Sequence, residues 1–161
     1  LALRLYTSNS YGRINWPLRG GCTEASPHPY AATTWYIHDG IMKLRATRAG
    51  DATAVRVFWR GMEDMDVTEE FLERGGTEMA CVSTTPERTV ARKFAKVGEV
   101  ANPLLIKVES TSLMDCGADI SWLSMYPEEK EVLFPPLTYL LPIGEPVVEN
   151  GCTVITVQPR F

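Results

Sequence analysis

The segment YPEEKEVLFPP, residues 126–136, joins an acidic run to three strand-forming residues and then stops at a pair of prolines. Because prolines are confined to strand ends and edges, this pattern predicts a short strand that ends at Phe134. If the chain is extended from Glu129 onward, Glu129 and Glu131 share one face and Lys130 lies opposite. The two carboxylates, about 6.5–7 Å apart, could then flank a sugar carbon, one stabilising positive charge and the other handling an acceptor. Acidic runs are also typical of solvated surface, so both interpretations stand at this point.

A second segment, CVSTTPE at residues 81–87, places hydroxyl side chains between a predicted strand and a predicted helix. Thr85 is the expected N-cap, with Pro86 at the first helical position. Because side chains alternate along an extended backbone, Ser83 and Thr85 share a face and Thr84 points away. Backbone N–H groups at such a junction can hold a pyrophosphate, although an ordinary capped turn has the same pattern.

Upstream, the stretch VRVFWRG at residues 55–61 ends a hydrophobic strand with Arg60, and Gly61 follows immediately. A guanidinium can bind phosphate oxygens through two parallel hydrogen bonds, and a glycine lets a ligand approach the backbone closely. The competing interpretation is a solvated strand end followed by a turn.

Length and composition indicate a single globular domain over residues 1–161. Hydrophobic residues make up 45% of the chain and charged residues 22%, which argues against disorder. Lys and Arg total 16 against 20 Asp and Glu, a formal net charge of −4, so no nucleic-acid partner is expected. No apolar run reaches the roughly 18 residues that cross a bilayer, so no membrane partner is expected either. Because the chain starts with Leu1, we expect a domain excised from a longer protein, with secretion slightly favoured over the cytoplasm.

The cysteines and histidines do not form a metal-binding pattern. The cysteines are far apart, without a C-x-x-C pair, and the full set is Cys22, Cys81, Cys116, Cys152, His28 and His38. No metal site is therefore expected, and both histidines are given structural roles. An even number of cysteines permits one or two disulfides, but structural or free thiols are the favoured interpretation.

Hydrophobic periodicity predicts helices early in the chain and mainly strands afterwards, which indicates an α+β fold. Helices are expected at about 10–19, 30–48 and 86–97, and strands at 54–59, 78–83, 104–109, 130–134, 138–141 and 153–157. Gly40 interrupts the second helical pattern. Residues 110–128 form a long irregular stretch, and such stretches are often functional.

The three segments occur in the order Arg60, Ser83, Glu131, and the last belongs to a longer pattern. From Ile120 to Pro136 the chain matches I-S-x-x-S-x-x-P-x-E-x-E-V-L-x-P-P nearly throughout. This resembles the arginine, serine, glutamate class of mono-ADP-ribosyltransferases, which includes cholera-like and actin-modifying toxins and vertebrate ecto-enzymes. The opening is also similar to the family, through the residues Tyr11, Ile14, Asn15, Leu18 and Arg19. Two departures are Thr85, where serine is usual, and Trp59, where phenylalanine or tyrosine is more common.

The resemblance implies an NAD cleft between two roughly perpendicular β-sheets, with helices packed at the N-terminal side. It implies catalysis by Arg60, Ser83, Glu129 and Glu131, and NAD+ contacts from Arg60, Gly61, Ser83, Thr84, Thr85 and Glu131. In this scheme Arg60 binds the phosphate and ribose of NAD+, and the Gly61 backbone binds the amide of nicotinamide. Ser83 orients Glu131, which bonds the ribose 2′-hydroxyl and stabilises the oxocarbenium ion. NAD+ is the co-substrate and no metal takes part.

Glu129 implies an arginine acceptor, because glutamine at this position goes with other acceptors. The resemblance also implies that the loop 119–129 meets a target protein through Trp122 or Tyr126, with a monomeric enzyme. Two alternatives share the same fold: an NAD+ glycohydrolase that uses water as acceptor, and a non-catalytic NAD-binding module. Phe94 could stack on nicotinamide, but its helical spacing favours packing in the core.

Overall fold

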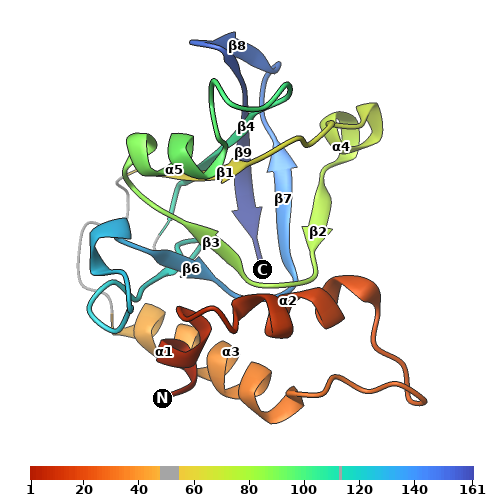
Figure 1. Ribbon diagram of the computed structural model, residues 1–161, viewed down its shortest axis with the longest axis vertical. Coiled ribbons are helices and arrows are strands. Elements are labelled where there is room, and N and C mark those ends of the chain that lie inside the picture. Colours follow the sequence, from red (N-terminus) through yellow and green to blue (C-terminus); the bar gives the residue numbers. More distant parts are fainter. Residues whose placement is uncertain (48–54, 113) are drawn as a thin grey trace.

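The computed structural model describes residues 1–47, 55–112 and 114–161, and it begins with three helices followed mostly by strands (Figure 1). The helices are α1 (Ala2–Tyr6), α2 (Tyr11–Gly20), α3 (Ala31–Ala46), α4 (Glu69–Arg74) and α5 (Arg88–Phe94), with a 3-10 helix η1 (Pro127–Glu129). The strands are β1 (Arg56–Met62), β2 (Gly76–Glu78), β3 (Val82–Thr84), β4 (Leu104–Ser110), β5 (Ala118–Asp119), β6 (Val132–Phe134), β7 (Thr138–Pro142), β8 (Val147–Glu149) and β9 (Cys152–Arg160). This order confirms the predicted α+β class.

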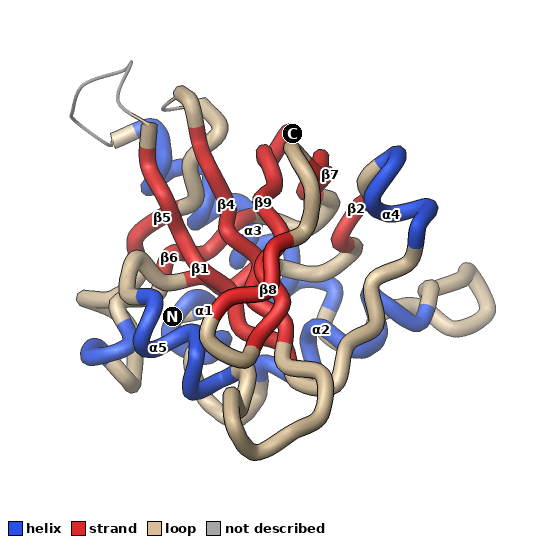
Figure 2. Tube along the Cα trace, turned by 90° about the horizontal axis from the view of Figure 1, so that it is seen from above, coloured by secondary structure: helices blue, strands red, loops and turns tan. Residues whose placement is uncertain are grey.

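The larger sheet has the strand order β1-β4-β9-β7-β2, and β8 pairs with β9 beside it. Figure 2 shows these strands side by side, with β4 and β9 near the middle. β4 and β9 run parallel, with Ile106 opposite Ile155. Both faces of β4 are covered, because Ile106 and Val108 lie in the main core while Leu105 packs under α5. The apolar runs that predicted strands at 104–109 and 153–157 are explained by this central position.

The smaller sheet has the order β3-β6-β5 and runs across the direction of β7 and β9 (Figure 1). One isolated bridge ties it to the edge of the larger sheet: Trp59 N–H donates to Thr85 O at 2.7 Å, and Thr85 N–H donates to Trp59 O at 2.9 Å. This bridge places the end of β1 directly beside β3. The expected two-sheet arrangement with N-terminal helices is confirmed.

The N-terminal helices pack on the smaller sheet through a separate core cluster. Ile37 and Ile41 of α3 are fully buried there together with Ile14 of α2 and Leu133 of β6. α3 continues through Gly40 without a break. The glycine lies where α1 packs against α3. A Cβ on Gly40 would lie 2.9 Å from Leu3 Cδ1, so the small residue makes room for α1.

Several predicted boundaries are wrong, and each error involves a short element. The strand expected at 78–83 is two strands in different sheets, since β2 ends at Glu78 and β3 begins at Val82. The helix expected from Pro86 begins at Arg88, and the strand expected from residue 130 begins at Val132. The elements α1, α4, β5 and β8 were not predicted. Residues 48–54, which include the ends of one predicted helix and one predicted strand, lie outside the described residues.

The cysteines are unpaired, and His28 takes part in backbone hydrogen bonds. All four cysteines lie in the described part of the chain and are free thiols, with Cys22 exposed and the others buried. His28 Nδ1 accepts from Tyr30 N–H at 2.9 Å, so its Nε2 is the atom that donates to Ile14 O at 2.8 Å. Within the described ranges, no helix is long and apolar enough to cross a membrane.

Candidate active site

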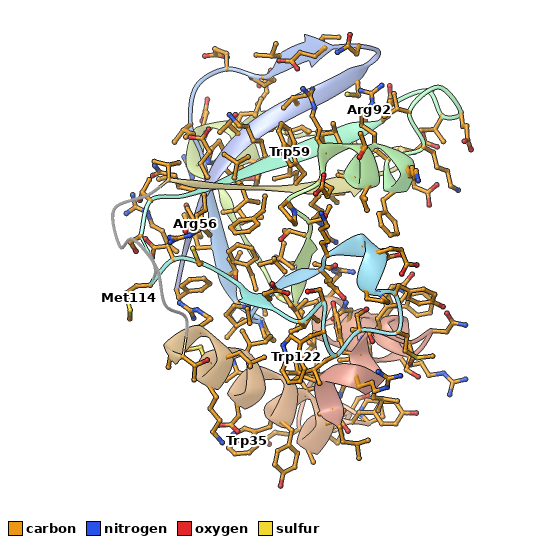
Figure 3. The ribbon with its side chains drawn as sticks, turned by 90° about the vertical axis from the view of Figure 1, so that its left-hand side faces the viewer. Trp35, Arg56, Trp59, Arg92, Met114 and Trp122 are labelled. Atoms are coloured by element: carbon orange, nitrogen blue, oxygen red, sulfur yellow. The ribbon has the colours of Figure 1, made fainter. Side chains whose placement is uncertain are left out.

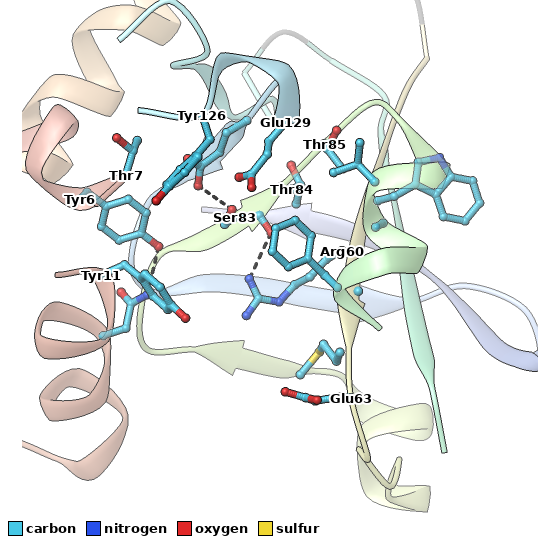
Figure 4. Close-up of a pocket in the computed structure, with 18 of the residues that line it drawn as sticks. Tyr6, Thr7, Tyr11, Arg60, Glu63, Ser83, Thr84, Thr85, Tyr126 and Glu129 are labelled. Carbon is cyan, nitrogen blue, oxygen red and sulfur yellow. Dashed lines mark hydrogen bonds between the residues drawn. The ribbon is translucent and has the colours of Figure 1, made fainter. Parts of the chain in front are cut away.

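A cleft of about 620 Å³ is lined by both sheets and by α1, α2 and α5. A volume of this size falls within the roughly 300–1,000 Å³ range of small-molecule sites. The cleft brings together all four side chains that the sequence assigned to catalysis, which are Arg60, Ser83, Glu129 and Glu131. Figure 4 shows the side chains around it, with Tyr6 and Tyr126 on the side of the N-terminal helices.

Ser83 and Glu131 form a direct hydrogen bond in this cleft. Ser83 Oγ donates to Glu131 Oε1 at 2.5 Å (Figure 4). Ser83 is the middle residue of β3 and Glu131 immediately precedes β6, and the antiparallel pairing of these strands sets Thr84 opposite Val132. The contact is therefore built on backbone pairing, which fixes both side chains. Glu131 is 7% exposed, so water competes little for its carboxylate.

Arg60 enters the cleft from the edge strand of the larger sheet. Its Nη1 donates to the carbonyl oxygen of Ser83 at 3.1 Å, which holds the guanidinium beside the Ser83–Glu131 pair. Burial lowers the pKa of Arg60, while the negative charges of Glu78 and Glu131 oppose that shift. An arginine keeps its charge in proteins, so the cleft contains a partly buried cation near a carboxylate.

Glu129 reaches the cleft by a route that differs from the predicted one. The chain is not extended from Glu129 to Glu131, because Glu129 ends the 3-10 helix η1 and Lys130 adopts a left-handed conformation with φ 48°. The expected alternation across Lys130 is therefore wrong. The turn nevertheless returns Glu129 to the same cleft, and Lys130 Nζ pairs outside with Glu87 Oε1 at 2.6 Å. Burial raises the pKa of Glu129, and the negative charge of Glu128 raises it further.

The environment of Glu131 predicts an effect on stability. Burial raises its pKa, and this outweighs the lowering by the Ser83 hydrogen bond; the charge of Glu129 adds to the rise. A carboxyl group with a raised pKa in the folded chain favours folding at low pH, and that contribution is lost as the pH rises through the folded pKa. We therefore expect Glu131→Gln to raise the free energy of unfolding at pH 7, since the amide oxygen still accepts from Ser83.

Urea denaturation at several pH values measures this effect, with the exposed Glu128 changed to Gln as the control. A free energy of unfolding higher by roughly 1 kcal/mol would also appear in thermal unfolding, as a Tm higher by about 2–4 °C in a domain of this size. The gain should shrink as the pH falls toward 4.5, the ordinary pKa of a glutamate. A Glu131→Gln variant that is less stable at pH 7, or a gain that grows on acidification, contradicts the expected cost of this buried charge.

Comparison with known proteins places the chain in a family. A family model described as NAD:arginine ADP-ribosyltransferase matches residues 1–154. The chain belongs to this family. It is similar to Mav of Mycobacterium avium strain 104, which is named as an NAD(+)–arginine ADP-ribosyltransferase, with 29% identity over 163 residues. It is also similar to ecto-ADP-ribosyltransferase 5 of Rattus norvegicus, with 27% identity over 152 residues.

The two curated ADP-ribosyltransferases are longer than this chain. The similarity covers 99% of the chain but 18% of Mav, and 89% of the chain but 46% of the rat enzyme. Among solved structures, exoenzyme S of Pseudomonas aeruginosa, crystallised with human 14-3-3 protein beta and carba-NAD, matches with 25% identity and a TM-score of 0.68. That match covers 98% of this chain and 70% of exoenzyme S. The ADP-ribosyltransferase fold inferred from the sequence is confirmed.

Gly61, which the family resemblance assigned to NAD+, has a packing role that the sequence did not suggest. A Cβ at Gly61 would lie 1.9 Å from Ala91 O and 2.6 Å from Ala95 N, so α5 packs directly on this backbone. Because peptide groups alternate along a strand, the N–H and C=O of Gly61 point to the same side as those of Trp59, away from β4. That side is the cleft, which Gly61 lines. The glycine thus seats α5 and also turns its peptide groups toward the ligand space.

Thr84 and Thr85 line the cleft, but their hydroxyl groups form hydrogen bonds to backbone groups of neighbouring residues. Thr84 Oγ1 donates to Val132 O at 2.7 Å, which fastens β3 to β6 and matches the expectation that Thr84 points away from Ser83. Thr85 is not the N-cap of α5, because that position belongs to Glu87. Thr85 Oγ1 accepts from Glu87 N–H at 3.1 Å, while its backbone pairs with Trp59. The NAD+ contacts assigned to both threonines remain predictions.

Phe94 does not pack in the core as its spacing indicated. Its ring is 54% exposed and lines the cleft, because α5 ends there and its buried face is carried by Ala91 and Ala95. Figure 3 shows Trp59 next to α5, on the covered side of the helix. The short helix presents one narrow apolar stripe to the sheet, and Phe94 lies off that stripe.

Tyr6 lines the cleft although no sequence pattern indicated it, whereas Asn15 and Arg19 belong to the family-like opening. Tyr6 belongs to α1 and is buried, with its hydroxyl accepting from Asn15 Nδ2 at 3.0 Å. Burial raises the pKa of Tyr6, so it stays neutral. Arg19 forms a two-point ion pair with Glu78, at 3.0 Å for each bond. Asn15 and Arg19 are four residues apart on α2 and therefore share a helix face. This spacing could have indicated that α2 and the neighbouring Tyr6 line the cleft.

Proposed function

We propose that this chain transfers ADP-ribose from NAD+ to arginine side chains of a protein acceptor and releases nicotinamide. The observation that carries the proposal is the hydrogen bond from Ser83 to the buried Glu131, with the Arg60 guanidinium bound to the strand of Ser83. Membership in the NAD:arginine ADP-ribosyltransferase family supports it. The presence of Glu129 in the same cleft supports arginine as the acceptor.

Binding of NAD+ would use the guanidinium of Arg60 and the peptide groups of Gly61, both on β1. Arg60 is suited to a phosphate of the NAD+ pyrophosphate, because a guanidinium offers paired donors in one plane. The peptide N–H and C=O of Gly61 can pair with the carboxamide of nicotinamide. Exoenzyme S, which has the same fold, was crystallised with the NAD+ analogue carba-NAD.

Cleavage of NAD+ breaks the bond between ribose C1′ and the nicotinamide nitrogen, and the bonding pair leaves with nicotinamide. Positive charge then develops on the ribose ring. The carboxylate of Glu131 stabilises this charge and accepts a hydrogen bond from the ribose 2′-hydroxyl, in the way that preorganised groups stabilise a transition state. Ser83 contributes by holding Glu131 in place, since its hydroxyl donates to that carboxylate.

Transfer then requires a nitrogen of the acceptor arginine to bond to C1′ and to give up a proton. Glu129 is suited to orient the guanidinium and to take this proton. Its pKa is raised by burial, and a higher pKa makes a carboxylate a better proton acceptor. The protein carrying the arginine would meet the loop 119–129, where Trp122 is 69% exposed and Tyr126 is 41% exposed.

The proposal is tested by incubating the purified chain with NAD+ and agmatine, a simple arginine analogue, and following nicotinamide and ADP-ribosylated product by mass spectrometry. We expect Glu129→Gln to lower the transfer rate by about 10²-fold or more, since it removes the proton acceptor, while NAD+ hydrolysis remains measurable. Glu145→Gln is the matched control, because Glu145 is exposed and does not line the cleft, so transfer should be unchanged.

Each other outcome identifies an alternative. Nicotinamide release without agmatine product indicates a glycohydrolase or a different acceptor, and NAD+ binding without release indicates a binding module. If transfer and hydrolysis fall equally in Glu129→Gln, the division of roles between Glu129 and Glu131 is wrong.

A further inference from the structure

The loop that carries Glu129 is held together mostly by its own hydrogen bonds. These are Leu123 N–H and Ser124 N–H to Ile120 O, each at 2.9 Å, Tyr126 N–H to Ser124 Oγ at 3.0 Å and Glu129 N–H to Tyr126 O at 3.1 Å. Two bonds leave the loop toward α1: Met125 N–H donates to Thr7 Oγ1 at 3.1 Å, and Leu123 O accepts from the exposed Arg4 Nη1 at 3.1 Å. The middle of the loop is thereby fastened to α1, 118 residues away in the chain.

Thr7 lies at the end of α1, where its hydroxyl group can accept the bond from Met125. It is the C-cap of α1 and is 8% exposed, so water does not readily replace its partner. Its hydroxyl donates to Arg4 O at 2.9 Å and accepts from Met125 N–H, which uses both kinds of hydrogen bond that a hydroxyl can form. Figure 4 shows Thr7 and Tyr126 on the same side of the cleft.

We propose that Thr7 is a positioning residue, which acts through Met125 to set where Tyr126 and Glu129 lie over the cleft. This inference rests on the proposed transferase function. The two ends of the loop are fixed separately on the smaller sheet, because Ile120 N–H donates to Glu131 O at 3.0 Å. Glu131 is also held by Ser83. Loss of the Thr7 contact therefore displaces the acceptor side of the site more than the side that cleaves NAD+.

The test compares Thr7→Val, which keeps the shape but removes the hydroxyl, with Thr7→Ser, which restores it. Thr47→Val is the matched control, because Thr47 is the C-cap of α3 and its Oγ1 likewise donates three residues back, to Leu44 O at 2.9 Å. The readouts are kcat and KM for agmatine at saturating NAD+, the rate of NAD+ hydrolysis without acceptor, and Tm.

We expect Thr7→Val to lower the ratio of transfer to hydrolysis by about five- to tenfold, the effect of losing one partly buried hydrogen bond to the loop. Most of the change should appear as a higher KM for agmatine. Thr7→Ser should return the ratio close to that of the parent chain, and Thr47→Val should leave it unchanged. Thr7→Ala serves as the second variant if Thr7→Val fails to fold.

An unchanged ratio of transfer to hydrolysis in Thr7→Val or Thr7→Ala overturns the inference alone, and this includes the case in which both rates fall by the same factor. Failure of Thr7→Ser to restore the ratio also overturns it. Absence of agmatine transfer by the parent chain overturns the proposed function itself, and the positioning role for Thr7 falls with it.

Discussion

Replacing Glu131 by Gln is expected to reduce nicotinamide release from NAD+ by about 10²–10³-fold or more, both with and without an arginine acceptor. The amide keeps the size of the side chain and its hydrogen bond from Ser83, but it carries no negative charge. Removing one preorganised electrostatic contact to a transition state commonly costs on the order of 3–4 kcal/mol. Because Glu131 is 7% exposed, water cannot readily take its place and stabilise the positive charge on the ribose.

The measurement is a time course of nicotinamide release at saturating NAD+, with calorimetry to show that NAD+ still binds. Glu128→Gln, an exposed neighbour on the same loop, should retain the parent rate. A Glu131→Gln variant that binds NAD+ and releases nicotinamide within tenfold of the parent rate would remove Glu131 from its role at the ribose. Retained stability is expected, so loss of fold is not an adequate explanation for lost activity.

The second large effect is structural: Gly61→Ala should destabilise the fold by about 1–3 kcal/mol or more. The added Cβ would lie 1.9 Å from Ala91 O and 2.6 Å from Ala95 N. Both are backbone atoms of the α5 segment, so no change of rotamer relieves the overlap. The helix must move away from β1, which loosens the cluster that contains Leu105, Cys152 and Val154.

Thermal or urea unfolding measures this loss, and Gly20→Ala is the matched control. Gly20 ends α2, has open space where its Cβ would lie and does not have a positive φ, so alanine there should leave stability unchanged or slightly raised. A Gly61→Ala chain within about 0.5 kcal/mol of the parent would mean that α5 does not rest on this backbone. NAD+ affinity should fall in Gly61→Ala as well, because Phe94 and Val90 of α5 line the cleft.

The long elements could be predicted from the sequence because their hydrophobic patterns repeat over enough residues. The predicted helix at 30–48 contains α3, where Ile37 and Ile41 recur at helical spacing and are fully buried. β4 was predicted because this central strand, covered on both faces, opens with the apolar run Leu104–Ile106. By contrast, α1 spans five residues and β5 spans two. Such elements are too short to show a period, and distant partners stabilise them.

Glu129 shows where a local pattern was misleading. Alternation in the EEKEVLF stretch indicates a strand, yet the residues before Val132 form a 3-10 turn with Lys130 in a left-handed conformation. The pairing of β3 with β6 ends at Val132, so no partner strand extends Glu129 and Lys130. Glu129 and Glu131 do line one cleft, although the extended geometry expected for them was wrong.

The sequence by itself determined the family and the α+β class, because these depend on residue types in a fixed order. It also singled out Arg60, Ser83, Glu129 and Glu131, whose catalytic roles remain predictions. Tertiary structure alone decided how they meet. The bridge between Trp59 and Thr85 brings Arg60 to Ser83, and the contact of α5 with Gly61 turns Phe94 into the cleft. The bond from Met125 to Thr7 fastens the loop of Glu129 to α1. Each contact joins residues at least 26 positions apart, and no local pattern encodes such a pairing, since its energy comes from groups that become neighbours only when the chain folds.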